Sequence, residues 1–187
     1  MGASTSWLAV KGKPREAVLQ ALGLGPGTAE EGWDTGLQGC EFPNGWYVVA
    51  ARGYFHRVMS DGVLKRISAG CEAVAGGVET HVMASTATGW RDGRQIWRAD
   101  HQSENGIEDL TTEGELPAVF AAIHEGLRAE QAAEGGPDCG VDFIFDVPVK
   151  LCRALTGYDY DESGPDEQWH SLIPVAKPSW LRRLLGR

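Results

Sequence analysis

The stretch THVMASTATGWRDGRQIWRADH, from Thr80 to His101, indicates most directly how this chain folds. Asp92-Gly93 near its middle favours the tight turn of a β-hairpin, because both residue types tolerate positive φ angles. Thr80–Thr88 precedes this turn and is rich in residues that favour strands, while Arg94–His101 follows it with alternating side chains. We therefore predict two antiparallel strands joined over Gly89 to Gly93.

Successive side chains of a strand point to opposite faces of its sheet. Ile96 and Arg98 are thus expected on one face, and Gln95 and Trp97 on the other. Tryptophan and arginine are enriched at the energetic centres of protein interfaces, but they also form ordinary cation–π packing on sheets. Both interpretations stay open. The first predicts a partner-binding surface on this hairpin, formed by Trp90, Arg91, Arg94, Trp97 and Arg98.

The chain before the hairpin predicts alternating strands and helices. Apolar runs rich in β-formers indicate strands, and apolar spacing of three to four residues indicates helices that end at glycine. The expected elements are a buried strand over Ser6–Val10, a helix from Pro14 to Gly23, a long loop over Gly25–Gly39 anchored by Trp33, a strand over Trp46–Ala51, a helix over Asp61–Ala69 with Asp61 as its cap, and a strand over Cys71–Ala75 that Gly76-Gly77 breaks.

The chain after the hairpin predicts mainly helices and then a tail. Ser103–Gly114 is polar and acidic, so we expect a loop there. The expected elements that follow are a long helix from Pro117 to about Glu134 with Val119, Phe120, Ile123 and Leu127 on its buried face, a further strand over Val141–Phe145, and a helix over Pro148–Leu155 capped by Asp146 and ended by Gly157.

These elements follow the order β-α-β-α-β-β-β-α-(β)-α. Strands joined by hairpins favour a mainly antiparallel sheet, and helices grouped on one face of it give an α+β architecture. We predict one α+β domain over residues 1–157. Residues 158–187 are expected to form an acidic extended tail that ends in a short amphipathic helix, with Trp180, Leu181, Leu184 and Leu185 on one face.

Charge and composition narrow the classes of partner. The 187 residues carry 26 acidic and 17 basic side chains, for a formal net charge of −9. No basic run exceeds two residues, as at Arg182-Arg183 near the end, whereas nucleic-acid binders usually present a basic face. No apolar run is long enough to span a membrane. We therefore predict a cytoplasmic protein with reduced cysteines, no nucleic-acid or membrane partner, and a protein partner that is basic.

Motifs for metal, cofactor and catalytic sites are missing from the sequence. None of the five histidines, at positions 56, 81, 101, 124 and 170, has another histidine or a cysteine at zinc-ligand spacing. The glycine-rich segment Gly23–Gly27 follows a predicted helix, whereas a phosphate-binding loop follows a strand. We predict no cofactor, no metal and no catalytic residue. The alternative is a small enzyme with a dispersed site, in which His81 or His101 works with Glu79 or Asp100, or with a cysteine.

Acidic side chains cluster in two further places. Such clusters are usually solvated surface, but they can also form a face for a basic partner. We include these clusters in the predicted partner-binding surface; they are Asp100, Glu104, Glu108 and Asp109 after the hairpin, and Asp159, Asp161 and Glu162 in the tail.

The segments SWLAV-KGK from Ser6, PNGWYVV from Pro43 and DVPVKLCRALTGYDYDE from Asp146 resemble a group of uncharacterised small bacterial proteins. The resemblance extends to about residue 165. It implies a bacterial origin and a single-domain fold, and nothing about mechanism. In general type the chain is also similar to bacterial immunity proteins, which are small, acidic and cytoplasmic and lack catalytic motifs.

Together these observations predict a non-enzymatic protein-binding module, of the kind that neutralises a bacterial toxin by occlusion. Acidic faces would steer the partner, and tryptophan and arginine would anchor it. Two alternatives stay open besides: the small enzyme described above, and a regulatory subunit that docks through its C-terminal helix. The sequence does not indicate an oligomeric state.

Overall fold

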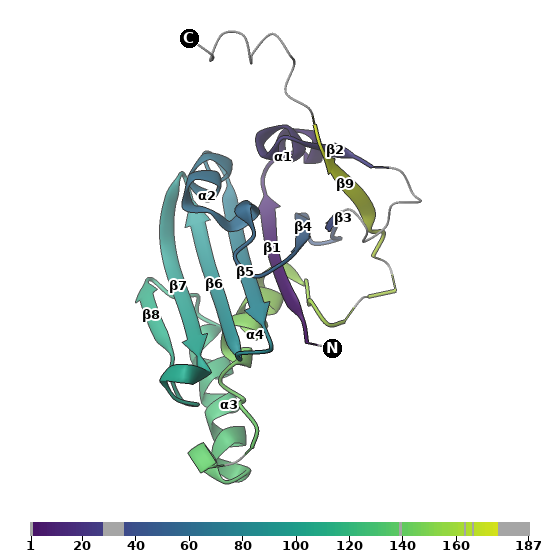
Figure 1. Ribbon diagram of the computed structural model, residues 1–187. Coiled ribbons are helices and arrows are strands. Elements are labelled where there is room, and N and C mark those ends of the chain that lie inside the picture. Colours follow the sequence, from purple (N-terminus) through teal and green to yellow (C-terminus); the bar gives the residue numbers. More distant parts are fainter. Residues whose placement is uncertain (1, 28–35, 139, 163, 166, 176–187) are drawn as a thin grey trace, which may run out of the picture.

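A computed structural model describes residues 2–27, 36–138, 140–162, 164–165 and 167–175. Within them the chain forms a nine-stranded sheet in the order β2-β9-β3-β4-β1-β5-β6-β7-β8, with four α-helices around it (Figure 1). Every pairing in the sheet is antiparallel. The α+β class with a mainly antiparallel sheet is thus confirmed.

The elements have the following bounds. The strands are β1 Ser4–Lys11, β2 Leu24–Pro26, β3 Leu37–Glu41, β4 Trp46–Arg52, β5 Glu72–Glu79, β6 Ala84–Arg91, β7 Arg94–Gln102, β8 Thr111–Gly114 and β9 His170–Pro174. The helices are α1 Arg15–Leu22, α2 Asp61–Ile67, α3 Phe120–Ala133 and α4 Asp146–Thr156, with 3-10 turns η2 Arg57–Met59, η3 Ser103–Asn105 and η4 Gly136–Asp138.

Strand β1 lies in the middle of the sheet and is buried on both faces. Leu8 and Val10 pack in the core with α1 and α2, whereas Trp7 and Ala9 pack in a second core with α4. The helices therefore cover both faces of the sheet, and the expectation that they group on one face is wrong (Figure 1). The reason is visible in β1 itself, because a continuous apolar run is typical of a strand that is covered on both sides.

Gly76-Gly77 does not break β5, which runs through both glycines to Glu79. The indole of Trp7 lies so close to Gly76 that a Cβ atom there would overlap the ring. Glycine at this position therefore makes room for a large core side chain from the neighbouring strand. The predicted strand break was wrong because a glycine that ends a strand and one that admits a ring look alike in sequence.

A β-bulge changes the faces of β7. Gly89 pairs with Trp97 and Trp90 pairs with Gln95, so Ile96 is an extra residue in its strand. Ile96 and Trp97 both pack with the core on the α4 side, and Gln95 and Arg98 both face the opposite side. The predicted hairpin is present, with Asp92 and Gly93 at positive φ, but the predicted alternation of its second strand is wrong.

Several predicted boundaries also differ from the structure. Residues 80–83 form the turn between β5 and β6, Val141–Phe145 is irregular rather than a strand, and the predicted loops contain β2, β3 and β8. Asp61 and Asp146 lie in the first turns of α2 and α4 and make no side-chain cap bond. The predicted tail contains β9, which pairs with β2 and β3. Trp33, Cys139 and the predicted helix over 180–185 lie outside the described residues.

We predict that Gly76→Ala lowers the free energy of unfolding by about 1–3 kcal/mol, because the added methyl group displaces the Trp7 ring from a filled core. Urea denaturation followed by circular dichroism measures the change. Gly126→Ala is the matched control, since its Cβ would enter open space on α3. It should raise stability by up to about 1 kcal/mol, as alanine does inside a helix. Equal effects of the two substitutions would contradict the packing argument.

Candidate functional site

A cavity with predicted interface residues in its lining lies at one end of β5, β6 and β7, on the side covered by α4. Its volume is about 340 Å³. The segment between β8 and α3 forms one wall, and the last turn of α4 forms another. We name it the tryptophan cleft; its lining residues are Trp46, Glu72, Ala73, Val74, Gly89, Trp90, Arg91, Ile96, Trp97, Glu115, Leu116, Pro117, Ala118 and Leu155.

The floor of the tryptophan cleft is apolar because of the bulge in β7. The bulge turns Ile96 to the same side as Trp97. The indole of Trp97 lies across Gly89, where any Cβ atom would overlap it. Trp46 and Leu155 belong to the same core cluster and line the cleft beside them. Helix α4 covers most of this core. The floor of the cleft is the end of the core that α4 does not cover.

The rim of the tryptophan cleft is charged. Arg91 on β6 pairs with Glu72 on β5, with 2.5 Å between Nη2 and Oε1, and both side chains are exposed. Glu115 is exposed on the opposite wall. Because the arginine and one glutamate neutralise each other, Glu115 leaves the rim with a negative charge. An apolar centre within a polar rim is the usual anatomy of a protein interface.

The predicted hairpin residues occupy different environments. Trp90 and Trp97 are largely buried, so neither ring projects from the surface. Trp90 packs in the core with α2, and its indole N–H donates to Thr88 Oγ1 over 3.0 Å. Arg91 and Arg94 are exposed on either side of the Asp92-Gly93 turn. The hairpin thus exposes Arg91 and Arg94, Trp97 forms part of the cleft floor, and Trp90 packs on the opposite face of the sheet.

Arg98 and Asp100 lie on the opposite face of the sheet, away from the tryptophan cleft. Arg98 Nε donates to Asp100 Oδ2 over 2.5 Å, and the Thr86 hydroxyl donates to the other carboxylate oxygen. The paired carboxylate of Asp100 raises the pKa of Arg98. Arg98 lines a smaller cavity together with Phe55, which is exposed at a positive φ of 55°.

The predicted acidic residues also divide by environment. Glu104 and Glu108 are exposed around η3, and Asp161 is exposed after α4. Asp159 and Glu162 both pair with Arg153 on α4, at 2.8 and 2.9 Å. The structure therefore places these acids in separate segments, and an acidic partner-binding surface over all of them stays a prediction.

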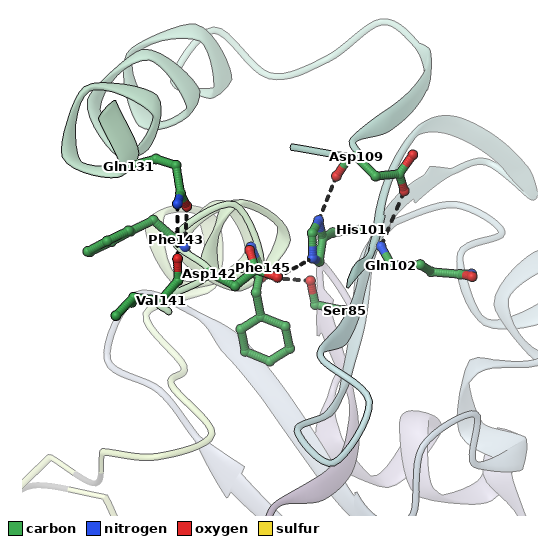
Figure 2. Close-up of polar contacts among 9 residues, drawn as sticks. All are labelled: Ser85, His101, Gln102, Asp109, Gln131, Val141, Asp142, Phe143 and Phe145. Carbon is green, nitrogen blue, oxygen red and sulfur yellow. Dashed lines mark hydrogen bonds and ion pairs between the residues drawn. The ribbon is translucent and has the colours of Figure 1, made fainter. Parts of the chain in front are cut away.

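His101 is fully buried, and both of its ring nitrogens face acceptors (Figure 2). Nδ1 lies 2.5 Å from the main-chain oxygen of Asp109, and Nε2 lies 2.9 Å from Asp142 Oδ2. These two contacts join the end of β7 to the segment before β8 and to the segment before α4. The other carboxylate oxygen of Asp142 accepts the N–H of Phe145 over 3.0 Å.

The same network explains why Val141–Phe145 is not a strand. Gln131 on α3 is buried, and its amide donates to the main-chain oxygens of Gly136 and Val141 while it accepts the N–H of Phe143. Ser85 donates to the main-chain oxygen of Phe145 over 2.7 Å (Figure 2). Side chains thus take the backbone groups that a sheet partner would otherwise use. Nothing in the local sequence around residue 141 signals these distant partners.

The residues of the predicted dispersed enzyme site are only partly brought together. His81 and Glu79 form a pair at 2.8 Å, with His81 largely exposed. Hydrogen bonds from the Ser4 hydroxyl and from His81 lower the pKa of Glu79. His101 meets Asp142 instead of the predicted Asp100, and that pair stabilises the fold between β7 and α4.

The cysteines in the described residues are buried thiols. Burial raises the pKa of Cys40, Cys71 and Cys152, and it raises that of Cys152 to about 12. A raised pKa disfavours the thiolate, which is the nucleophilic form. These three side chains therefore serve as core packing.

Known proteins provide no further guide. Comparisons with protein families, with characterised proteins and with solved structures found no match to this chain. The resemblance to small bacterial proteins therefore stays a prediction. Within the described ranges, no three His, Cys, Asp or Glu side chains gather closely enough to hold a metal ion. No helix of that part of the chain combines the length and apolar character needed to cross a membrane.

We predict that Asp142→Ala lowers the free energy of unfolding by about 3–5 kcal/mol, because it leaves the buried His101 Nε2 and the Phe145 N–H without partners. Asp142→Asn should cost much less. Its amide oxygen can still accept the Phe145 N–H, and its N–H can donate to His101 Nε2. Urea denaturation of both variants measures the difference in the free energy of unfolding. Equal losses of stability would show that the His101–Asp142 pair does not stabilise the segment Val141–Phe145.

We also predict that stability falls as the pH rises from 9 toward 12, because Cys152 has an ordinary pKa of 9.0 and a folded pKa of about 12. The unfolded chain loses this proton first, so alkaline pH favours unfolding, whereas below pH 9 the thiol has no such effect. Urea midpoints measured across this range test the slope. Cys152→Ala should make the slope shallower without removing it, because burial also raises the pKa of Cys40, Cys71 and Tyr54. An unchanged slope in this variant would contradict the assignment.

Proposed function

We propose that this chain is a non-enzymatic protein-binding module whose tryptophan cleft receives an apolar side chain of a basic partner. The observation that carries the proposal is the apolar floor of Ile96, Trp97 and Leu155 inside a charged rim. Interfaces concentrate their binding free energy in such pockets, where one side chain loses all contact with water.

The size of the tryptophan cleft supports a single anchoring side chain. Its volume of about 340 Å³ lies at the lower end of ligand pockets, which suits a leucine or phenylalanine side chain of a protein better than a large free ligand. Complete burial of such a side chain contributes about 1.5–3 kcal/mol. The floor is held by residues with little freedom, since Trp97 lies fixed on Gly89. A rigid floor reduces the entropy that binding costs.

Charge supports a basic partner. The chain has a net charge of −9, so it attracts positively charged proteins over distances of about a Debye length. At the tryptophan cleft, Arg91 is neutralised by Glu72, and Glu115 remains to meet a lysine or arginine beside the anchor. Complementary charge mainly raises the association rate and excludes acidic competitors.

The proposal includes a class of partner, namely a toxin that this module neutralises by covering its functional surface. An acidic module can cover the basic substrate-binding surface of such a protein through charge complementarity. The proposal also includes a cytoplasmic location, where reduced thiols persist, and the buried free cysteines Cys40, Cys71 and Cys152 are compatible with it.

We predict that a random peptide library displayed on phage, selected on the folded chain, enriches peptides with a large apolar residue next to lysine or arginine. A consensus peptide should bind wild-type protein in fluorescence polarisation. Ala118→Arg should weaken binding at least about tenfold, equal to about 1.4 kcal/mol, because it adds a cation and bulk to the lining.

Ala121→Arg is the matched control for this experiment. Ala121 is exposed in the first turn of α3, three residues after Ala118, but does not line the cleft, so its substitution should leave the peptide affinity within about twofold. Acidic consensus peptides, or equal effects of the two alanine substitutions, would overturn the proposal.

A further inference from the structure

A second cavity lies on the other side of β1, where β9 is inserted between β2 and β3. Its volume is about 450 Å³. The residues that define this pocket, which we call the β9 pocket, are Arg15, Glu41, Gln168, Trp169 and His170. It differs from the tryptophan cleft because charged and polar groups make up most of its lining.

A hydrogen-bonded chain orients the polar groups of the β9 pocket. Tyr47 is buried, and its hydroxyl lies 3.1 Å from His170 Nε2. Arg15 forms a hydrogen bond to the same hydroxyl. Because an arginine can only donate, Tyr47 accepts from Arg15 and is left to donate its own proton to His170. Gly39 permits this arrangement, since a Cβ atom there would overlap the Tyr47 hydroxyl.

The protonation state of His170 agrees with this direction. Burial lowers the pKa of His170, and the positive charge of Arg15 lowers it further. The ring is therefore neutral near pH 7, with Nε2 free to accept from Tyr47, and a hydrogen bond to the main chain of Gln168 fixes its other nitrogen. Arg15 is thus positioned by the neutral groups Tyr47 and His170. Neither of them neutralises the positive charge of its guanidinium.

Opposite charges face the β9 pocket without meeting. Arg15, at the start of α1, forms no ion pair with any carboxylate in the described residues, and neither does Glu41 with any cation there. Both nevertheless line the same cavity. A half-buried arginine with spare donors favours a carboxylate, which it can bind through two parallel hydrogen bonds.

The remaining wall is a fixed aromatic ring. The indole N–H of Trp169 donates to Glu167 over 2.8 Å. Its ring packs edge-to-face on Phe42 and Tyr158, with centroids 6.2 and 5.5 Å away. Trp169 also lines the β9 pocket, so it adds an aromatic residue of fixed position to the wall.

We propose that the β9 pocket binds a small zwitterionic amino acid. The ligand's carboxylate pairs with Arg15, its ammonium group pairs with Glu41, and its side chain packs on Trp169. The ligand would supply each charge with a partner that the described residues do not provide. This site is independent of the tryptophan cleft, because the two share no lining residue.

Isothermal titration calorimetry with L-phenylalanine at low ionic strength tests this proposal. We expect saturable binding, and at least tenfold weaker binding of N-acetyl-L-phenylalanine, which lacks the ammonium charge, and of L-phenylalanine amide, which lacks the carboxylate. Arg15→Gln and Glu41→Gln should each reduce the affinity at least about tenfold.

The matched controls are Arg57→Gln and Glu16→Gln, which change exposed residues outside the pocket and should leave the affinity within about twofold. No saturation at about 10 mM L-phenylalanine, or equal binding of the three compounds, would overturn the proposal. Peptide binding at the tryptophan cleft should be the same in Arg15→Gln as in wild-type protein, so failure at one site is distinguishable from failure at the other.

Discussion

The fold depends on the burial of both faces of β1 in the middle of the sheet. On one face the Trp7 indole fills the space that Gly76 leaves on β5, in a core that also contains Cys152 of α4. On the other face Leu8 packs with α1 and α2. This strand pairs with β4 and β5 along its whole length, so one apolar segment aligns the sheet and positions helices from both ends of the chain.

The tryptophan cleft follows from how far this packing extends. Helix α4 covers the sheet up to Leu155 and then ends at Gly157, whose positive φ of 84° terminates the helix. Strands β5 to β7 continue beyond that point, and the bulge adds Ile96 to their apolar face. The cleft is therefore continuous with the hydrophobic core. It is the part of the core that no element of the described chain covers, and its charged rim is what keeps it compatible with water.

Local signals predicted the elements whose causes are local. Asp92-Gly93 specified a hairpin, and Gly23 and Gly157 ended helices as expected. The predictions that were wrong share a different cause. Each of these segments is determined by a contact with residues far away in the sequence. Gly76 depends on Trp7, the loop before α4 depends on Gln131, and β9 needs β2 and β3. The cleft residues Trp97 and Arg91 were recognisable by type, but the bulge that arranges them was not, because it shows only in the pairing register.

The β9 pocket shows the same limit more sharply, because its groups come from the start of α1, from β3 and from β9. No window of sequence contains them together. Strand β9 pairs with short segments of its neighbours, through Gln38 and Gly39 on β3 and Leu24–Pro26 on β2. A strand held by so few pairs gains from any further link to the sheet. A ligand bound between Arg15 and Glu41 would stabilise the docked state of β9 by mass action, since the undocked strand cannot complete the pocket. Occupancy of the pocket would then be thermodynamically coupled to the docking of β9 on the sheet.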